Sequence, residues 1–500
     1  MMKQIRQIIF FILMTASTYL ILFTSVPALW KWIAGTVYFA ILFSILFVLM
    51  LEQRSPYKTL LWMYVLIFFP IIGYVFFLFS GQLEVQGHLF KEKRTNGLEF
   101  FQKHVNFSAS ERWHDLSERN QNFSNLIATM VSSPISMRSQ TKLLLNGSDT
   151  FSAIKDEIKK AKTYIHLEYY TFRSDELGKS IIQLLVDKAK EGVEVRVLYD
   201  SIGSHNLSRA SKNALRAAGA SVQQFLPLKY GFFNQTVNFR NHRKIIVIDG
   251  RTAFVGGLNI GDEYAGDYNG MKYWRDTHLL VKGEIISAVH GVFLMDWEYM
   301  SGESLLSEKY LEAYEVDGDG GTQVVPSGPD TKRSAMTDLY FNLITTAKER
   351  VWIATPYFVP NKALRSALSI AAMRGVEVKL IVPEVSDGFL TQYATRSYFS
   401  QLLEYGVEIY MYQRGFLHQK IMIVDDDMAT IGTANMDMRS MHLNFEVNVF
   451  LFQASTISDL VHAYRNDIED SVKVDKHRYQ ERGLLHRTKE SFARLFSPVL

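Results

Sequence analysis

One short phrase occurs twice in this chain, far apart. Residues 192–197 are GVEVRV and residues 375–380 are GVEVKL, 183 positions further on. Each phrase begins with a glycine typical of a helix C-terminus and continues as an alternating, β-branched strand pattern. A period this long exceeds the roughly 20–50 residues of solenoid repeats. The repeat therefore predicts an α/β fold in which a whole lobe is duplicated.

The same order of elements is predicted in both copies. A strand is followed by a helix with apolar residues at 3–4 spacing, by the glycine, and by a second strand. In the first copy these elements are Thr163–Tyr170, Asp175–Lys190 and Val193–Leu198, and in the second Val351–Phe358, Lys362–Met373 and Val376–Val382. We expect a first lobe over 141–315 and a second over 325–475, together forming one domain with a pseudo-twofold axis.

The first eighty residues differ from the rest of the chain in charge and hydropathy. Uncharged stretches cover 7–30, 32–51 and 59–83, the last apolar mainly over 60–79. About 20 apolar residues are enough to cross a bilayer core. Residues 1–83 are therefore predicted to be a membrane anchor of two to three helices, making this a multi-pass protein of the cell membrane. Pro70 and Gly73 interrupt the third stretch.

Two other interpretations of this region fit less well. A cleaved signal peptide is disfavoured because 24 uncharged residues exceed a usual apolar core and a second stretch follows at once. A buried helical hairpin of a soluble protein is the remaining alternative.

Two further segments lie outside the lobes. Residues 84–140 are polar and are predicted to be a connector near the membrane. Residues 476–500 carry six cations against two anions, with apolar residues such as Leu484 and Phe492. We predict a basic amphipathic helix on anionic headgroups there, and a helix packed on the domain is an equally good alternative.

Composition excludes several classes of function. The chain has no Cys, so disulfide frameworks, thiolate nucleophiles and zinc–thiolate sites are excluded. Residues 81–500 carry 49 cations and 50 anions. A near-neutral balance argues against a sequence-independent nuclease, and no nucleic-acid partner is expected.

A second repeated pattern, His-x-Lys-x4-Asp, lies inside the lobes. Chance predicts roughly 0.03 occurrences for this composition, yet there are two, and their flanking residues repeat as well. The first set is His242, Lys244, Asp249, Gly256, Gly257 and Asn259, and the second is His418, Lys420, Asp425, Gly432, Thr433 and Asn435.

This spacing suits chemistry on a phosphate group. Residues i and i+2 of a strand share a face, so each histidine points with its lysine. The runs IIVI and IMIV that follow predict buried parallel strands. An imidazole can attack phosphorus, an ammonium can stabilise the phosphoryl oxygens, and glycines let the backbone approach the phosphate. A lone histidine of this kind would be a core residue, but two full copies favour a paired site.

With these motifs the chain resembles the phospholipase D superfamily, and within it the bacterial cardiolipin synthases. The resemblance runs from about residue 50 to the end. The segments that carry it are EQRSPYKTLLW (52–62), NFRNHRKIIVIDG (238–250), VGGLNIGDEY (255–264), YWRDTH (273–278), LHQKIMIVDD (417–426) and GTANMDMRSMHLNFEVN (432–448).

The resemblance implies a mechanism without metal or cofactor. His242 would attack the phosphodiester to form a phosphohistidine, and His418 would protonate the leaving glycerol and then accept a proton from the acceptor. Lys244, Lys420, Asn259 and Asn435 would hold the non-bridging oxygens. Asp276 and Glu446 match carboxylates that orient the two histidines, although their spacing from Asn259 and Asn435 differs, 17 residues against 11. Asp249 and Asp425 would brace the fold.

The implied reaction joins two phosphatidylglycerol molecules into cardiolipin and releases glycerol. Alternatives are a membrane phospholipase or another phosphatidyltransferase with a different acceptor. From other classes, a membrane-tethered nuclease and a non-catalytic lipid-binding scaffold stay open.

Overall fold

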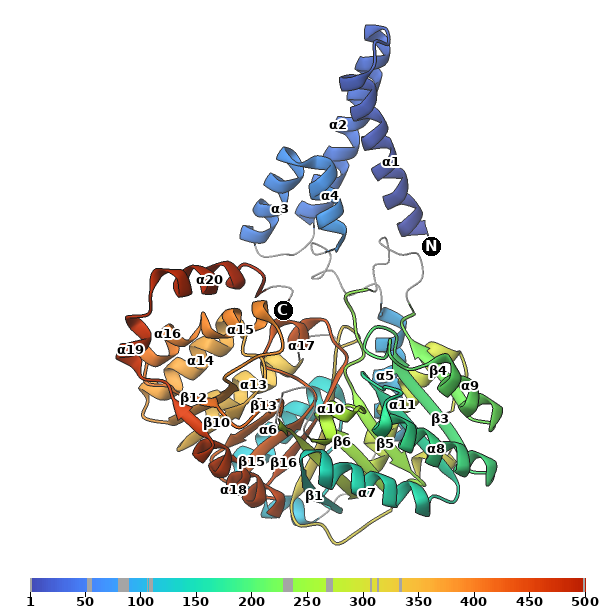
Figure 1. Cartoon of the computed structure of the whole chain (residues 1–500), viewed down its shortest axis with the longest axis vertical. Helices are drawn as coiled ribbons and strands as arrows, with labels where there is room; N and C mark the ends of the chain where they lie inside the picture. The colour runs from blue at the N-terminus through green and yellow to red at the C-terminus, as the bar shows by residue number, and fades with distance from the viewer. Residues whose placement is uncertain are drawn as a thin grey trace. The chain divides into compact units, whose positions relative to one another are not determined.

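The computed structural model describes residues 2–51, 56–79, 90–105, 107, 111–227, 237–266, 273–305, 308–312, 314–331, 335–497 and 500. The chain divides into two units (Figure 1). The smaller comprises 1–89 with 228–238, and the larger 90–227 with 239–500. Residues 80–89, which include the end of the third apolar stretch and the beginning of the expected connector, lie outside the described residues.

The helices described in the small unit are apolar. Among the described residues one helix, α2 (Ala28–Leu51), is long and apolar enough to cross a membrane, while Ile8–Phe23 and Thr59–Phe68 are shorter apolar segments. The helix α1 (Met2–Phe23) packs along α2, with Met14 of α1 and Leu49 of α2 both buried in one apolar cluster.

The third apolar stretch does not form one helix. It is divided at Phe69 into α3 (Pro56–Phe68) and α4 (Pro70–Phe79). Pro70 lacks the N–H that a continuous helix needs, and a Cβ at Gly73 would lie 2.7 Å from the Val65 carbonyl oxygen, so the two segments approach closely. Neither α3 nor α4 has the roughly 20 residues of a full span.

Two mixed β-sheets form the two lobes of the large unit. Their strand orders are β1-β8-β6-β5-β2-β3-β4 and β17-β12-β11-β10-β14-β15-β16-β9. Read from β1 and from β9, the two orders correspond strand for strand, with β17 added at one edge. A short third sheet pairs β13 with β7 across the lobes.

Three of the four strands predicted with bounds form within two residues of them, whereas the strand expected over Val351–Phe358 ends at Ala354. The first sheet contains β1 (Ser139–Leu145), β8 (Thr277–Gly283), β6 (Thr252–Gly256), β5 (Lys244–Ile248), β2 (Tyr164–Tyr169), β3 (Glu194–Asp200) and β4 (Ser221–Phe225). The second contains β17 (Ser471–Lys473), β12 (Glu408–Tyr412), β11 (Glu377–Pro383), β10 (Arg350–Ala354), β14 (Ile421–Val424), β15 (Met428–Gly432), β16 (Glu446–Phe452) and β9 (Gly321–Ser327). The third pairs β13 (Phe416–Leu417) with β7 (Trp274–Arg275).

The two motif strands are buried, but the prediction that they are parallel is wrong. Strand β5 is antiparallel to both β2 and β6, and β14 is antiparallel to both β10 and β15. Asp249 and Gly250 have φ of 52° and 65° and turn the chain directly from β5 into β6. An Asp-Gly pair after an apolar run is a hairpin signal, so β5 and β6 form a hairpin and are antiparallel.

Helices pack around the sheets of both lobes (Figure 1), and one of them, α11 (Ile285–Ser301), is almost wholly buried. The first lobe has α7 (Asn146–Lys160), α8 (Glu176–Lys190), α9 (Arg209–Ala217), α10 (Asp262–Ala265), α11 (Ile285–Ser301) and α12 (Glu308–Leu311). The second has α13 (Ala335–Thr346), α14 (Lys362–Met373), α15 (Phe389–Arg396), α16 (Phe399–Glu404), α17 (Met438–His442), α18 (Ser455–Glu469), α19 (Lys476–Gln480) and α20 (Leu484–Arg494). Each lobe has its own large apolar core.

The region expected as a connector differs from that expectation. From Phe90 onward it belongs to the large unit and contains α5 (Lys91–His104), the 3-10 turn Glu111–Asp115 and α6 (Glu118–Val131). Phe123, Ile127 and Val131 of α6 recur at four-residue spacing and are buried in the core of the second lobe. Burial of this apolar stripe explains why the segment folds onto the domain.

Candidate functional site

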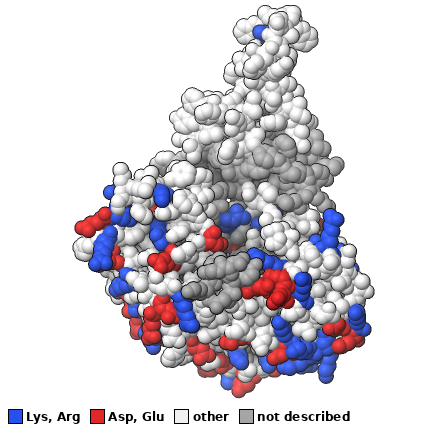
Figure 2. All heavy atoms as spheres, in the orientation of Figure 1, with Lys and Arg blue, Asp and Glu red and all other residues white. Residues whose placement is uncertain are grey.

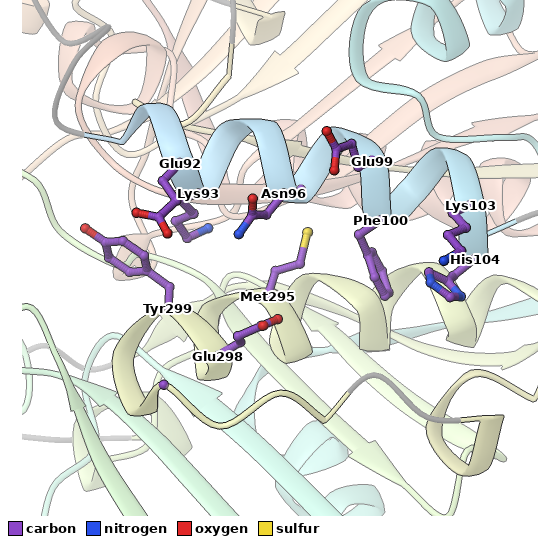
Figure 3. A pocket seen from close by; sticks show the side chains of 12 residues that line it. Glu92, Lys93, Asn96, Glu99, Phe100, Lys103, His104, Met295, Glu298 and Tyr299 are labelled. Carbon is purple, nitrogen blue, oxygen red and sulfur yellow. The ribbon is translucent and has the colours of Figure 1, made fainter.

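Both motif histidines line one cavity of about 570 Å³ in the large unit. Asn259 and Asn435 line the same cavity. The fold therefore brings together residues from two sequence copies that lie 176 positions apart at the histidines. A second cavity of about 540 Å³ lies between α5 and α11 (Figure 3), and its lining contains no residue predicted for the site.

Each histidine is hydrogen-bonded to a carboxylate of the opposite lobe. Nδ1 of His242 lies 2.9 Å from Oε2 of Glu446, and Nδ1 of His418 lies 2.7 Å from Oδ2 of Asp276. Both carboxylates are fully buried. Because Nδ1 of each ring is occupied by a carboxylate, Nε2 is the nitrogen available to a group in the cavity.

The backbone holds these pairs in place. The N–H of His242 donates to the Phe445 carbonyl at 2.9 Å, and the N–H of Phe445 donates to the Arg240 carbonyl at 2.9 Å. In the other half, the N–H of His418 donates to the Arg275 carbonyl at 2.7 Å, next to the β13–β7 pair. The segment before each histidine is thus bonded to the segment before the carboxylate that orients it.

The electrostatics of the site favour neutral imidazoles. Burial, together with Lys244 and Lys420, lowers the pKa of His242 to about 4 against the opposing effect of Glu446. Burial and Lys420 lower the pKa of His418 to about 3. Although burial works to raise them, the pKa values of Asp276 and Glu446 are held below the ordinary range by their lysine and histidine neighbours. The carboxylates are therefore charged and the rings uncharged at neutral pH.

The side chain of each motif lysine bonds the backbone of the histidine in the same motif. Nζ of Lys244 donates to the His242 carbonyl at 2.6 Å, and Nζ of Lys420 donates to the His418 carbonyl. Burial lowers the pKa of Lys244 well below its ordinary value and that of Lys420 to about 8. Among the described residues that line the cavity, neither lysine occurs.

The two asparagines are held differently. Oδ1 of Asn259 accepts the N–H of Thr171 at 3.1 Å. The N–H of Asn435 donates to Oγ of Ser440 at 3.1 Å, while its buried Oδ1 has no hydrogen-bond partner among the described residues. Both side chains remain at the cavity wall.

The small residues after each motif make room for other side chains. A Cβ at Gly257 would lie 2.1 Å from Oδ1 of Asp276, and one at Gly256 would lie 2.5 Å from Nδ1 of His278. A Cβ at Gly432 would lie 2.4 Å from Oδ1 of Asn448, and Oγ1 of Thr433 accepts the N–H of Val447. The described lining of the cavity contains none of the four. Close packing against neighbouring side chains is therefore enough to explain why these positions are small, without any contact to a phosphate.

The motif aspartates bind backbone N–H groups outside the described cavity lining. Asp249 accepts hydrogen bonds from the N–H groups of Lys162, Thr163 and Tyr164. Asp425 accepts those of Lys348, Glu349 and Arg350 and pairs with Arg119. Each carboxylate thereby fastens the motif hairpin to the beginning of the neighbouring strand.

Several cavity residues were not predicted from the sequence. They include Arg240 and Arg439, and the aromatic rings of Tyr170, Trp274 and Tyr357. The ring of Tyr170 lies 5.1 Å from that of His242, and the ring of Trp274 lies 5.0 Å from that of His418. Arg240 lies two positions before His242, and Trp274 lies two positions before Asp276. This spacing could have indicated from the sequence that both residues lie at the site.

The described residues contain no group of three or more His, Asp or Glu side chains arranged to hold a metal ion.

Comparisons with known proteins agree with this architecture. Residues 154–297 and 340–470 match the family described as "Cardiolipin synthase, PLD-like domain", and residues 37–82 match "Phospholipase_D-nuclease N-terminal". A probable cardiolipin synthase of Bacillus subtilis, YwiE, is 48% identical and a cardiolipin synthase of Alkalihalophilus pseudofirmus is 43% identical, both over the full length of both chains.

Among solved structures, a phosphatidylserine synthase of Haemophilus influenzae is similar in fold. It aligns with a TM-score of 0.59 and 17% identity over 76% of this chain and 99% of its own. The two lobes therefore define a phospholipase D-like protein. Within that class, the chain belongs to the cardiolipin synthase family, which confirms the resemblance seen in the paired motifs.

Proposed function

We propose that this protein is a phosphatidyltransferase that joins two phosphatidylglycerol molecules into cardiolipin and glycerol. The observation that carries the proposal is one cavity lined by two imidazoles, each with Nδ1 on a buried carboxylate. This arrangement supplies a nucleophile and an acid–base group to a single phosphodiester. Full-length relatives named cardiolipin synthase support the same substrates.

In the first step, Nε2 of His242 attacks phosphorus and the bond from phosphorus to the glycerol oxygen breaks. His418 gives its Nε2 proton to that oxygen, and a phosphohistidine remains. The negative charge of a bound phosphate favours the protonated form of His418 that this step needs, opposing the lowering of its pKa by burial and Lys420. Asp276 stabilises the imidazolium through Nδ1.

In the second step, His418 takes a proton from a glycerol hydroxyl of the second phosphatidylglycerol. The resulting oxygen attacks phosphorus, and the bond to His242 breaks. One phosphodiester replaces another, so no nucleotide is consumed. Charge on the phosphoryl oxygens is stabilised by two lysines and two asparagines. Asn259 and Asn435 act from the cavity wall, and Lys244 and Lys420 act from their positions next to the histidine backbone.

We further propose that the small unit anchors the protein by more than one helix. The length and hydropathy of α2 suit a span, and α1 packs along it with an apolar surface of its own. Trp30 and Trp32 at the beginning of α2 are exposed, as suits residues at headgroup depth. Such an anchor keeps the enzyme where both lipid substrates are concentrated.

The decisive experiment incubates the purified full-length protein with pure phosphatidylglycerol. We expect cardiolipin and free glycerol in equal amounts. His242→Ala and His418→Ala should each lose more than the roughly 10²–10⁴-fold that a missing acid–base group costs. His462→Ala, at an exposed histidine on α18, serves as the matched control.

The outcome of that assay separates the alternatives. Phosphatidic acid in place of cardiolipin would indicate a phospholipase, and product formation only with another alcohol would indicate a different acceptor. Residual transfer above a tenth of the wild-type rate in either alanine variant would contradict the paired site.

A further inference from the structure

Helix α20, near the C-terminus, turns its apolar side chains away from the domain. Leu484 and Leu485 of α20 and Leu495 directly after it are 79%, 67% and 75% exposed, and Phe492 of α20 and Phe496 after it are also exposed. Their positions, i, i+1, i+8, i+11 and i+12, lie on one side of a helix. An isolated exposed leucine needs no explanation, but five exposed apolar side chains on one side of a segment do.

The inner side of the same segment is polar or small. Glu490 and Ala493 are buried, and Glu490 binds the Tyr479 hydroxyl at 2.8 Å and the Arg482 guanidinium at 2.6 Å. Just beyond the helix, Oγ of Ser497 is hydrogen-bonded to the Tyr398 hydroxyl at 2.8 Å. These polar contacts fix which side faces the domain, so the outward apolar stripe is imposed by the fold.

This surface lies next to the candidate active site. Helix α20 packs on α15, where Nζ of Lys489 lies 5.4 Å from the centre of the Tyr393 ring. Gly388, directly before α15, and Thr391, in its first turn, line the histidine cavity, and so does Leu500. Phe389 and Val385, at and just before the beginning of α15, are themselves exposed apolar side chains.

Cationic residues flank the stripe. Arg487 and Arg494 are exposed on α20, and Figure 2 shows basic side chains together with some acidic ones on this part of the surface. An apolar stripe bordered by cations matches the interface of a bilayer with anionic headgroups. A second protein chain would not need the excess of positive charge carried by residues 476–500.

We propose that α20, with the exposed residues at the beginning of α15, docks on the surface of an anionic bilayer and holds the mouth of the histidine cavity against it. The proposal rests on the function proposed above, because a lipid substrate must reach the cavity from a membrane. The N-terminal anchor keeps the protein on the membrane, whereas α20 sets how the large unit faces it.

The first test measures insertion without using activity. Since the chain has no cysteine, Leu485→Cys carries a single environment-sensitive fluorophore. The full-length chain also carries His242→Ala, so that lipid is not consumed, and is reconstituted in phosphatidylglycerol or phosphatidylcholine vesicles. Lys159→Cys, at an exposed position of α7, is the matched control.

We expect a blue shift and quenching by spin-labelled lipid at position 485 in phosphatidylglycerol vesicles, a weaker response in phosphatidylcholine, and none at 159. Equal spectra at 485 with and without anionic lipid would overturn the proposal. A shift that depends on protein density and is not quenched by spin-labelled lipid would overturn it in favour of contact between two copies of the chain.

The second test links docking to lipid access. The double variant Leu485→Glu, Leu495→Glu should lose on the order of tenfold in transfer from phosphatidylglycerol vesicles. With soluble short-chain phosphatidylglycerol it should stay within about twofold of wild type. Equal loss on both substrates would overturn the docking role. Failure of the wild type to form cardiolipin would instead refute the proposed function and leave the insertion result standing.

Discussion

Oε2 of Glu446 lies 2.9 Å from Nδ1 of His242, although the two residues belong to different lobes and are 204 positions apart. Asp276 of the first lobe and His418 of the second form the equivalent pair. Neither lobe therefore contains a complete histidine–carboxylate pair. The duplicated fold forms its site only when both sheets are in place, and each lobe determines the orientation of the other's histidine.

Removing either carboxylate's charge should slow transfer strongly. In Glu446→Gln and Asp276→Asn the side chain keeps its size but no longer stabilises the imidazolium, and we expect a loss on the order of 10²–10⁴-fold in kcat. The measurement is cardiolipin formation at saturating lipid, with the thermal midpoint as a check of folding. Rates within threefold of wild type in both variants would show that the buried pairs are not used.

Gly257 should be intolerant of any side chain because of Asp276. A Cβ there would lie 2.1 Å from Oδ1 of Asp276, so Gly257→Ala must displace the carboxylate from His418. We expect at least a hundredfold loss of transfer by analogy with mispositioned catalytic groups. Gly483→Ala, where a Cβ would meet nothing within 4 Å, should match wild type. Similar rates in the two variants would argue against this packing role.

Buried histidines should make the protein less stable in acid. Burial lowers the pKa of His278 to about 4, while in the unfolded chain it is close to its ordinary 6.5. Below pH 6.5 the histidine is protonated in the unfolded state but stays neutral in the folded state. Its contribution to the free energy of unfolding is therefore complete above pH 6.5 and is lost as the pH falls toward 4.

The variant His278→Leu tests the predicted loss of stability in acid. Between pH 7 and pH 5, the free energy of unfolding of wild type should fall by about 2 kcal/mol more than that of the variant. Chemical denaturation in detergent at the two pH values measures the difference. Parallel pH dependence of the two proteins would contradict the assignment.

Lys93 of α5 should support the site through buried charge. Its Nζ lies 2.7 Å from Asp296 and 2.5 Å from Asp330, and Arg243, next to His242 in sequence, binds the other oxygen of Asp296. Figure 3 shows Lys93 near Tyr299 of α11. Lys93→Met would remove one of the two cations that neutralise the buried Asp296, together with the ion pair to Asp330, at a cost of about 3–5 kcal/mol.

The comparison that isolates this charge is made on the same helix. Lys91→Met, at an exposed position, should leave the thermal midpoint unchanged, and Lys93→Arg should recover part of the loss. Equal midpoints for Lys93→Met and wild type would show that the buried cluster does not depend on Lys93.

Chelation should leave transfer largely intact. In the proposed mechanism the imidazoles and lysines supply the attack, the proton and the charge stabilisation, and the described residues offer no cluster of metal ligands. The assay compares cardiolipin formation before and after treatment with a chelator. Complete inhibition that one particular metal reverses would contradict this prediction.

Local pattern in the chain was enough to predict the duplicated α/β lobes, with the helix Lys362–Met373 formed at its predicted bounds. The repeated histidines and lysines identified the family, because side-chain chemistry at fixed spacing is readable without knowing the fold. The same local reasoning missed the hairpin direction of β5 and β14 and the incorporation of α6, since strand pairing and helix docking depend on partners distant in sequence.

Tertiary structure decided how the lobes share one site. Sequence spacing pointed to Asp276 and Glu446 without revealing that each crosses to the opposite lobe, and it left the outward direction of the α20 stripe open. The shared site depends on contacts between distant segments, such as the N–H of His242 on the Phe445 carbonyl, and the direction of α20 depends on hydrogen bonds such as that between Ser497 and Tyr398. Periodicity records which residues are apolar or charged, whereas only packing determines which surface each of them meets.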